Sequence, residues 1–148
     1  MVYDALRIAR YIIGRCNEKG RAISNLKLQK MLYFVQAEFL VTKGPTSPCF
    51  NEEIEAWDFG PVVPVVYQQY KIYGGANIPA SEKIIGTKNI AEKDQNIING
   101  IVDECVNYSA SALVDITHHQ TPWIQAYRKG SHNNVISKQS IFDFFVER

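Results

Sequence analysis

The most reactive side chains in this sequence are three cysteines, and their spacing argues against metal or redox chemistry. Cys16, Cys49 and Cys105 are far apart and odd in number, which fits neither a disulfide framework nor a Cys-x-x-Cys site. Cys105 falls on an apolar stripe, where burial makes a thiol inert. We therefore predict reduced, structural cysteines. A Cys/His nucleophile pair stays open at this point, because its two members need only meet in space.

The histidines match no metal-binding or nuclease motif. Neighbours on a helix point about 100° apart, so His118 and His119 make a poor ligand pair, and no cysteine or carboxylate completes a ligand spacing. Helical ribonucleases of the HEPN type have a wider Arg–His spacing than the three residues between Arg128 and His132. The sequence also lacks phosphate-binding loops, a serine nucleophile elbow and the zinc-protease helix motif. We therefore predict no catalytic, cofactor-binding or metal site.

Basic residues gather at the N-terminal end of the chain. Residues 1–43 hold eight Lys or Arg and three Asp or Glu, whereas residues 44–148 hold eight and twelve. A basic end can be a footprint for nucleic acid. The simpler interpretation is an amphipathic first helix with Arg7, Arg10 and Arg15 in water. The buried stripe of that helix is then predicted to consist of Ala5, Ile8, Ala9, Ile12 and Ile13.

The stretch from Ser24 to Leu40 predicts the helix that organises the domain. Ser24 is a good N-cap, and Ile23 and Leu28 occupy the two positions of a hydrophobic staple. Apolar side chains cover opposite flanks of this helix, so we expect other elements to pack against both. The two flanks consist of Leu28, Met31, Leu32, Val35 and Phe39, and of Leu26, Tyr33, Ala37 and Leu40. Two polar strips lie between them: Gln29 with Gln36, and Lys27, Lys30 and Glu38 with Phe34.

Shorter elements are predicted around this helix. Residues 51–59 alternate as a short strand that ends at Gly60–Pro61, and Pro64 suits the first position of a helix that runs to about Tyr73. Residues 83–86 are a candidate second strand. Further helices are expected from Asp94, over Ala110–His118, from Pro122 after a Thr121 cap, and from Ser137 with Ile141, Phe142, Phe144 and Phe145 in the core.

Together these elements predict a mainly α protein: one compact helical domain over residues 1–148 with a small two- or three-stranded β element. The length is sufficient for a sizeable core. No apolar run is long enough to cross a bilayer, and the chain opens directly into a helix pattern without a leader. We expect a cytoplasmic protein with no membrane partner.

Three blocks of this sequence, in order, resemble one known family. The first runs from Asn25 to Ala37. The second runs from Ile54 to Val62 and is followed by Val66–Tyr67, and the third holds Leu113 to His118, then Pro122–Trp123 and Ala126. The pattern is similar to the Panacea domain, the family of phage-associated GepA-like proteins and SocA-like antitoxins, and it covers the chain from about Ile23 to Phe144. Three blocks in order are far more specific than any one of them.

The resemblance implies a non-enzymatic antitoxin of a toxin–antitoxin system. Members neutralise a protein toxin encoded beside them, most often by direct binding, and these toxins are very diverse. In the SocA-like branch the antitoxin also delivers its toxin to an ATP-dependent protease. The implied partners are therefore a cognate toxin and such a protease, with no cofactor. Two other classes stay open: a DNA- or RNA-binding regulator that uses the basic N-terminal face, and an unrecognised hydrolase or ribonuclease.

Most motif residues have structural explanations. We expect Gln29 and Gln36 to satisfy buried backbone groups, because an unpaired polar group inside a protein costs about 1–3 kcal/mol. Trp57 is predicted to be a core aromatic whose indole N–H finds a partner. With His118, these side chains are predicted to form one internal polar seam. The other motif residues with a predicted structural role are Gly60, Pro61, Tyr67, Thr117, Pro122 and Trp123.

The predicted toxin-binding surface is the strip of Lys27, Lys30, Phe34 and Glu38, together with the exposed face of the first helix. An aromatic anchor rimmed by charge is the usual composition of a binding hot spot. The alternative is that the first helix covers Phe34, so that the strip is only the margin of that contact.

Overall fold

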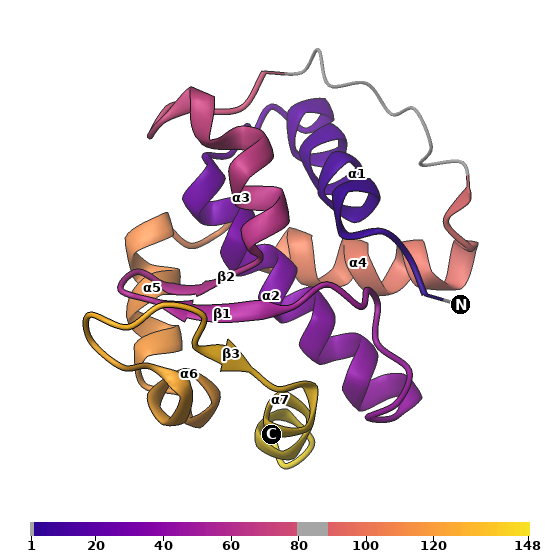
Figure 1. Cartoon of the computed structure of the whole chain (residues 1–148). Helices are drawn as coiled ribbons and strands as arrows, with labels where there is room; N and C mark the ends of the chain where they lie inside the picture. The colour runs from indigo at the N-terminus through magenta and orange to yellow at the C-terminus, as the bar shows by residue number, and fades with distance from the viewer. Residues whose placement is uncertain (1, 80–88) are drawn as a thin grey trace.

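A computed structural model describes residues 2–79 and 89–148 of the chain (Figure 1). Helices make up most of it, with one small antiparallel sheet, as the sequence predicted. The elements, in chain order, are α1 (Ala5–Glu18), α2 (Asn25–Lys43), β1 (Ile54–Trp57), β2 (Gly60–Val62), α3 (Pro64–Tyr70), the 3-10 turn η1 (Lys71–Tyr73), α4 (Glu92–Cys105), α5 (Ala110–His118), α6 (Thr121–Ala126), β3 (Val135–Ile136) and α7 (Lys138–Phe145). The predicted strand at residues 83–86 lies outside the described residues.

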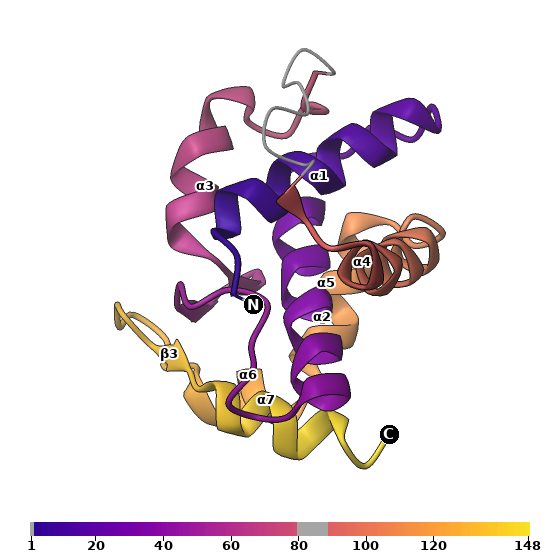
Figure 2. The same ribbon diagram turned by 90° about the vertical axis from the view of Figure 1, so that its right-hand side faces the viewer.

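Helix α2 runs through the centre of the molecule, with the other elements arranged around it (Figures 1 and 2). The side chain of Ser24 accepts a hydrogen bond from the backbone N–H of Lys27 and so caps the helix. Twelve of its nineteen residues are buried, around most of the circumference of the helix. The central position predicted from its circumferential apolarity is confirmed.

Helices α1 and α4 cover one side of α2 and are joined by side-chain bonds. The five residues predicted as the apolar stripe of α1 are all fully buried. Arg15 is not simply solvated, because it forms an ion pair of 2.7 Å with Asp103 of α4. Buried Asp94, in the first turn of α4, accepts hydrogen bonds from Tyr3 and Lys43 and so ties three segments together. No helix of the described residues is long and apolar enough to span a membrane.

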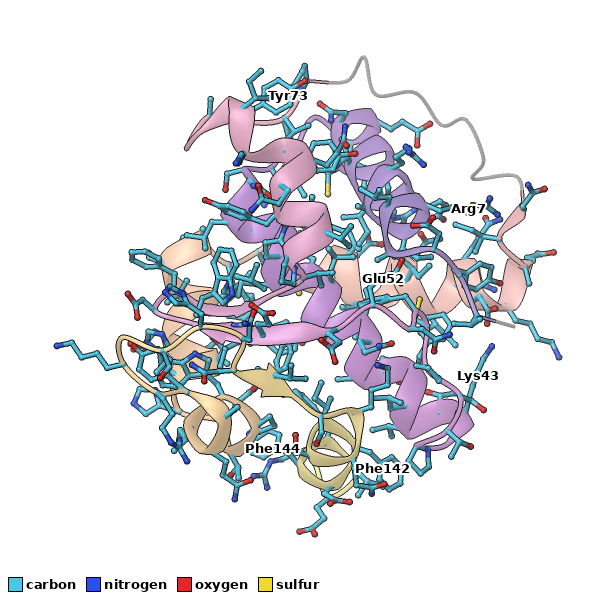
Figure 3. All side chains as sticks on the ribbon, in the orientation of Figure 1. Arg7, Lys43, Glu52, Tyr73, Phe142 and Phe144 are labelled. Atoms are coloured by element: carbon cyan, nitrogen blue, oxygen red, sulfur yellow. The ribbon has the colours of Figure 1, made fainter. Side chains whose placement is uncertain are left out.

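The sheet has three antiparallel strands in the order β2-β1-β3. The predicted single strand was extended too far: Asp58 and Phe59 form a tight turn, and Gly60 begins β2, which pairs back onto β1 with Trp57 opposite Gly60. Strand β3 was not predicted and pairs with β1 through Glu55 and Val135. Figure 3 shows Glu52 where the chain enters β1, and its carboxylate accepts a hydrogen bond from the first residue of α1.

The ends of the remaining helices follow local signals closely. Val63 is extended and Pro64 opens α3, as expected for a residue before proline. Helix α5 has the predicted bounds. The predicted Thr121 cap was wrong by one residue, because Gln120 is the N-cap, without a side-chain cap bond. In α7, Ser137 caps the helix and Ile141 is buried; Phe142 and Phe145 are only partly buried against the core, and the half-buried Phe144 packs on Phe145 (Figure 3).

Candidate functional site

Two side chains of α2 hold the hairpin of β1 and β2 on the side that faces the core. Lys30 Nζ donates a hydrogen bond of 2.9 Å to the carbonyl of Pro61. Gln29 Oε1 accepts one of 2.9 Å from the N–H of Val63, at the exit of the hairpin. Both bonds reach backbone atoms, so they fix the path of the hairpin whatever side chains it carries.

Two side chains from α5 and α6 hold the tip of the same hairpin. His118 Nε2 lies 2.8 Å from the backbone carbonyl of Asp58. Because a carbonyl only accepts, this nitrogen must carry the proton. Trp123 Nε1 donates a bond of 2.8 Å to the carbonyl of Trp57. The three motif blocks therefore converge on one element, and all four supporting bonds end on backbone atoms.

Gly60 fits between these supports because it has no side chain. Its φ of +100° is one that residues with a Cβ rarely adopt. A Cβ built there would lie 2.6 Å from Lys30 Cε and 2.8 Å from Thr117 Oγ1. Glycine at this position lets the hairpin approach α2 and α5 closely enough to form the bonds described above.

Lys30 is fully buried beneath the hairpin, which corrects its predicted place on an exposed strip. Burial lowers the pKa of its ammonium group to about 7. Among the described residues no carboxylate forms an ion pair with it. Lys30 is therefore a hydrogen-bond donor within the core and is not part of an exposed strip in this structure.

The other three residues of the predicted strip face different neighbours. Glu38 is half-buried, and its carboxylate accepts a hydrogen bond of 3.2 Å from the Thr42 hydroxyl, one turn further along α2. Lys27 Nζ donates to the carbonyl of Val106 at 3.3 Å, beside the end of α4. Phe34 is partly buried and packs against the last helix, with its ring edge-on to Phe145 at 6.1 Å, and not against the first helix as the alternative held. Periodicity identified the strip but could not show which elements would cover it. The strip does not form one exposed surface.

The predicted polar seam exists as separate bonds and not as one network. Gln36 Oε1 accepts from the N–H of Cys49 at 2.7 Å, and its Nε2 donates to the carbonyl of Phe50 at 2.8 Å. Both Gln36 and Gln29 therefore satisfy buried backbone groups, as predicted. They serve different segments, however, because they lie seven residues apart on the helix: Gln36 bonds to the chain before β1 and Gln29 to the chain just after β2.

Trp57 is half-buried, which corrects its predicted place in the core. Its indole N–H donates to Glu55 at 2.9 Å, and its ring stands edge-on to Tyr67 at 4.9 Å. With its neighbours it lines a groove of about 490 Å³ between the hairpin and the loop that joins α6 to β3. The lining residues are Glu55, Ala56, Trp57, Asp58, Phe59, Tyr127, Gly130, Ser131, His132 and Asn133.

A stack of aromatic rings forms one wall beside this groove. His118 lies 4.2 Å from Trp123, and Trp123 stacks on Tyr127 at 4.5 Å. The Tyr127 hydroxyl donates to the Asp58 carboxylate, and this hydrogen bond raises the pKa of Tyr127. The stack links the motif residues to the groove. Sequence reasoning gave no site role to Asp58, Phe59 or Tyr127. The Asp-Phe-Gly-Pro turn was a signal for the first two, whereas Tyr127 had none.

The three cysteines are buried and form no disulfide bonds, and burial disfavours their reactive thiolate form. Burial raises the pKa of Cys16 to about 11 and that of Cys105 to about 12, and it raises the pKa of Cys49 as well. All three are therefore thiols at neutral pH. Within residues 2–79 and 89–148, no three His, Cys, Asp or Glu side chains are grouped so as to hold a metal ion.

Comparison with known proteins identifies the family. The model of the SocA-like antitoxin, Panacea domain, matches residues 28–124, from α2 into α6. Antitoxin SocA of Caulobacter vibrioides (strain NA1000 / CB15N) is 37% identical over 130 residues, which cover 81% of this chain and 68% of that protein. No solved structure matches. The chain belongs to the SocA-like antitoxin family with a Panacea domain, which confirms the resemblance seen in its three motif blocks.

Proposed function

We propose that this protein is a non-enzymatic antitoxin that neutralises a cognate protein toxin by binding it directly. Family membership supports the antitoxin role. The observation that carries direct binding is the hairpin, which four hydrogen bonds hold through its backbone while Phe59 at its tip is 65% exposed. Such an arrangement presents side chains to a partner from a rigid base.

The basic N-terminal region offers less support for a nucleic-acid-binding regulator. Five of its eight basic side chains bond to acceptors within the protein: Arg15, Arg21, Lys27, Lys30 and Lys43. Binding to phosphates needs several free cations on one face. The enzyme alternative draws no support from the cysteines, whose raised pKa values disfavour a thiolate nucleophile.

Neutralisation can be tested by co-expression with the product of the neighbouring gene. The chain should restore the growth of cells that produce this toxin, and it should co-purify with the toxin in a fixed stoichiometry. Rescue that persists in cells lacking ATP-dependent proteases indicates that binding suffices. Rescue that needs a protease indicates instead that the chain acts as an adaptor for degradation. If the wild type binds no neighbouring gene product, the antitoxin proposal is wrong.

A further inference from the structure

We propose that the solvent face of the small sheet, with the groove beside the hairpin, is the surface that binds the toxin, and that it takes a basic segment. An arginine or lysine side chain of the toxin would lie between the carboxylates of Glu55 and Asp58 and the aromatic walls. This inference rests on the proposed function and adds the location of the interface and the chemistry of the partner.

The two faces of the sheet differ in the way that a binding surface requires. Ile54, Ala56 and Ile136 are buried and face the core. Successive residues of a strand point to opposite faces, so Glu55 and Trp57 lie on the other face. Val135, directly opposite Glu55 on β3, is 41% exposed. Val62, opposite Glu55 on β2, is buried, so the open part of this face lies over β1 and β3, where it presents apolar, aromatic and acidic side chains.

The groove holds two carboxylates, Glu55 and Asp58, that form no ion pair within the described part of the protein. One oxygen of Glu55 accepts from Trp57, and one oxygen of Asp58 accepts from Tyr127. These bonds orient the carboxylates but leave both charges in place. The ion pairs of the described residues are Arg15–Asp103, Lys43–Asp94 and His119–Asp115, and none involves the groove. A cation from outside is the complementary partner.

The aromatic walls favour the same ligand. The faces of tryptophan and tyrosine attract cations, and a planar guanidinium can stack on them while it bonds to a carboxylate. Trp57 and Tyr127 both line the groove, and exposed Phe59 adds an apolar contact at the tip. Aromatic side chains beside charged groups are typical of the energetic centre of protein interfaces.

The acidic surface continues along β1, which favours a segment over a single side chain. A second groove of about 230 Å³ is lined by Glu52, Glu53, Glu55, Pro64 and Val65. Glu55 belongs to both grooves, so they form one band along the strand. Val65 is 46% exposed and places an apolar group within this band. A partner segment with basic and apolar residues fits it better than an acidic one.

The test compares two double variants, each of which removes two negative charges. Glu55→Gln with Asp58→Asn neutralises the groove with side chains of the same shape. Glu18→Gln with Glu104→Gln is the matched control, because both residues are exposed and lie on α1 and α4. Binding to an inactivated form of the toxin from the neighbouring gene is measured by calorimetry. We expect the groove variant to bind at least about thirtyfold more weakly, the scale of a hot spot, and the control within about twofold of the wild type.

A third variant keeps the inference testable if the charge changes disturb the fold. Phe59→Ser alters only an exposed side chain at the hairpin tip and should weaken binding by about tenfold or more. Circular dichroism and melting check that each variant is folded. If the wild type binds the toxin and both groove variants bind as tightly, this surface is wrong while the proposed function stands. If the wild type itself does not bind, the proposed function fails and the surface with it.

Discussion

Lys30 should make the stability of this protein depend on pH across the neutral and mildly alkaline range. Burial lowers the pKa of this lysine from 10.5 in an unfolded chain to about 7 in the folded protein. Between these two values the unfolded chain binds a proton that the folded protein does not. The free energy of unfolding contributed by Lys30 therefore rises with pH, by up to about 1.4 kcal/mol per pH unit. Below pH 7 both states are protonated, so the dependence disappears.

The substitution that isolates this effect is Lys30→Met, which keeps the length of the side chain but cannot ionise. Urea unfolding of both proteins, under reducing conditions, gives the difference in their free energies of unfolding at each pH. Contributions from the cysteines, tyrosines and carboxylates are common to both proteins and cancel. We expect the stability of the wild type relative to the variant to increase by about 2 kcal/mol between pH 7 and pH 9, and to change little between pH 5.5 and 6.5.

An exposed lysine provides the control. Lys71→Met removes an ammonium group that is already in water, so its difference from the wild type should stay flat over the same range. A difference between wild type and Lys30→Met that is constant from pH 7 to pH 9 would refute the reasoning. It would mean that Lys30 keeps an ordinary pKa and that the hairpin is more open to water than the structure indicates.

Two further substitutions test the hairpin and the central helix, each by thermal and urea unfolding. Gly60→Ala should destabilise the protein by about 2 kcal/mol or more, because the new Cβ meets Lys30 and Thr117 at a strained φ, whereas Gly75→Ala, with no atom within 4 Å of the new Cβ, should be nearly neutral. Leu32→Ala should cost about 2–5 kcal/mol through a cavity in the core, whereas Val146→Ala on the surface should change stability by less than about 0.5 kcal/mol. An unchanged midpoint for Leu32→Ala would be incompatible with the central position of α2.

The parts of the fold that the sequence predicted are those set by neighbouring residues. Ser24, Pro64 and Ser137 mark helix starts through caps and a fixed φ, which act within one turn. The stripe of α1 follows from a periodicity of a few residues. Each of these patterns lies within a few neighbouring residues, so it predicts local structure without any knowledge of tertiary contacts.

The groove could not be predicted, because it is formed by contacts between distant segments. Strand β3 has two residues, too few for any alternation, and exists only because it pairs with β1. Tyr127 meets Asp58 across 69 residues of sequence. Lys30 was placed on the surface because α2 is apolar on most sides, and nothing in its own sequence shows that the hairpin covers that strip. Pattern alone predicts which helix is buried, but not which elements cover it.

The residues that stabilise the hairpin differ from the residues whose side chains line the groove. The four bonds from Lys30, Gln29, His118 and Trp123 all end on backbone atoms of residues 57–63. None of these bonds involves the side chain of Glu55, Asp58 or Phe59, so exchanging those side chains removes none of them. The same scaffold can therefore carry different groove chemistries at little cost in folding, provided that Gly60, which fits between the supports, is kept.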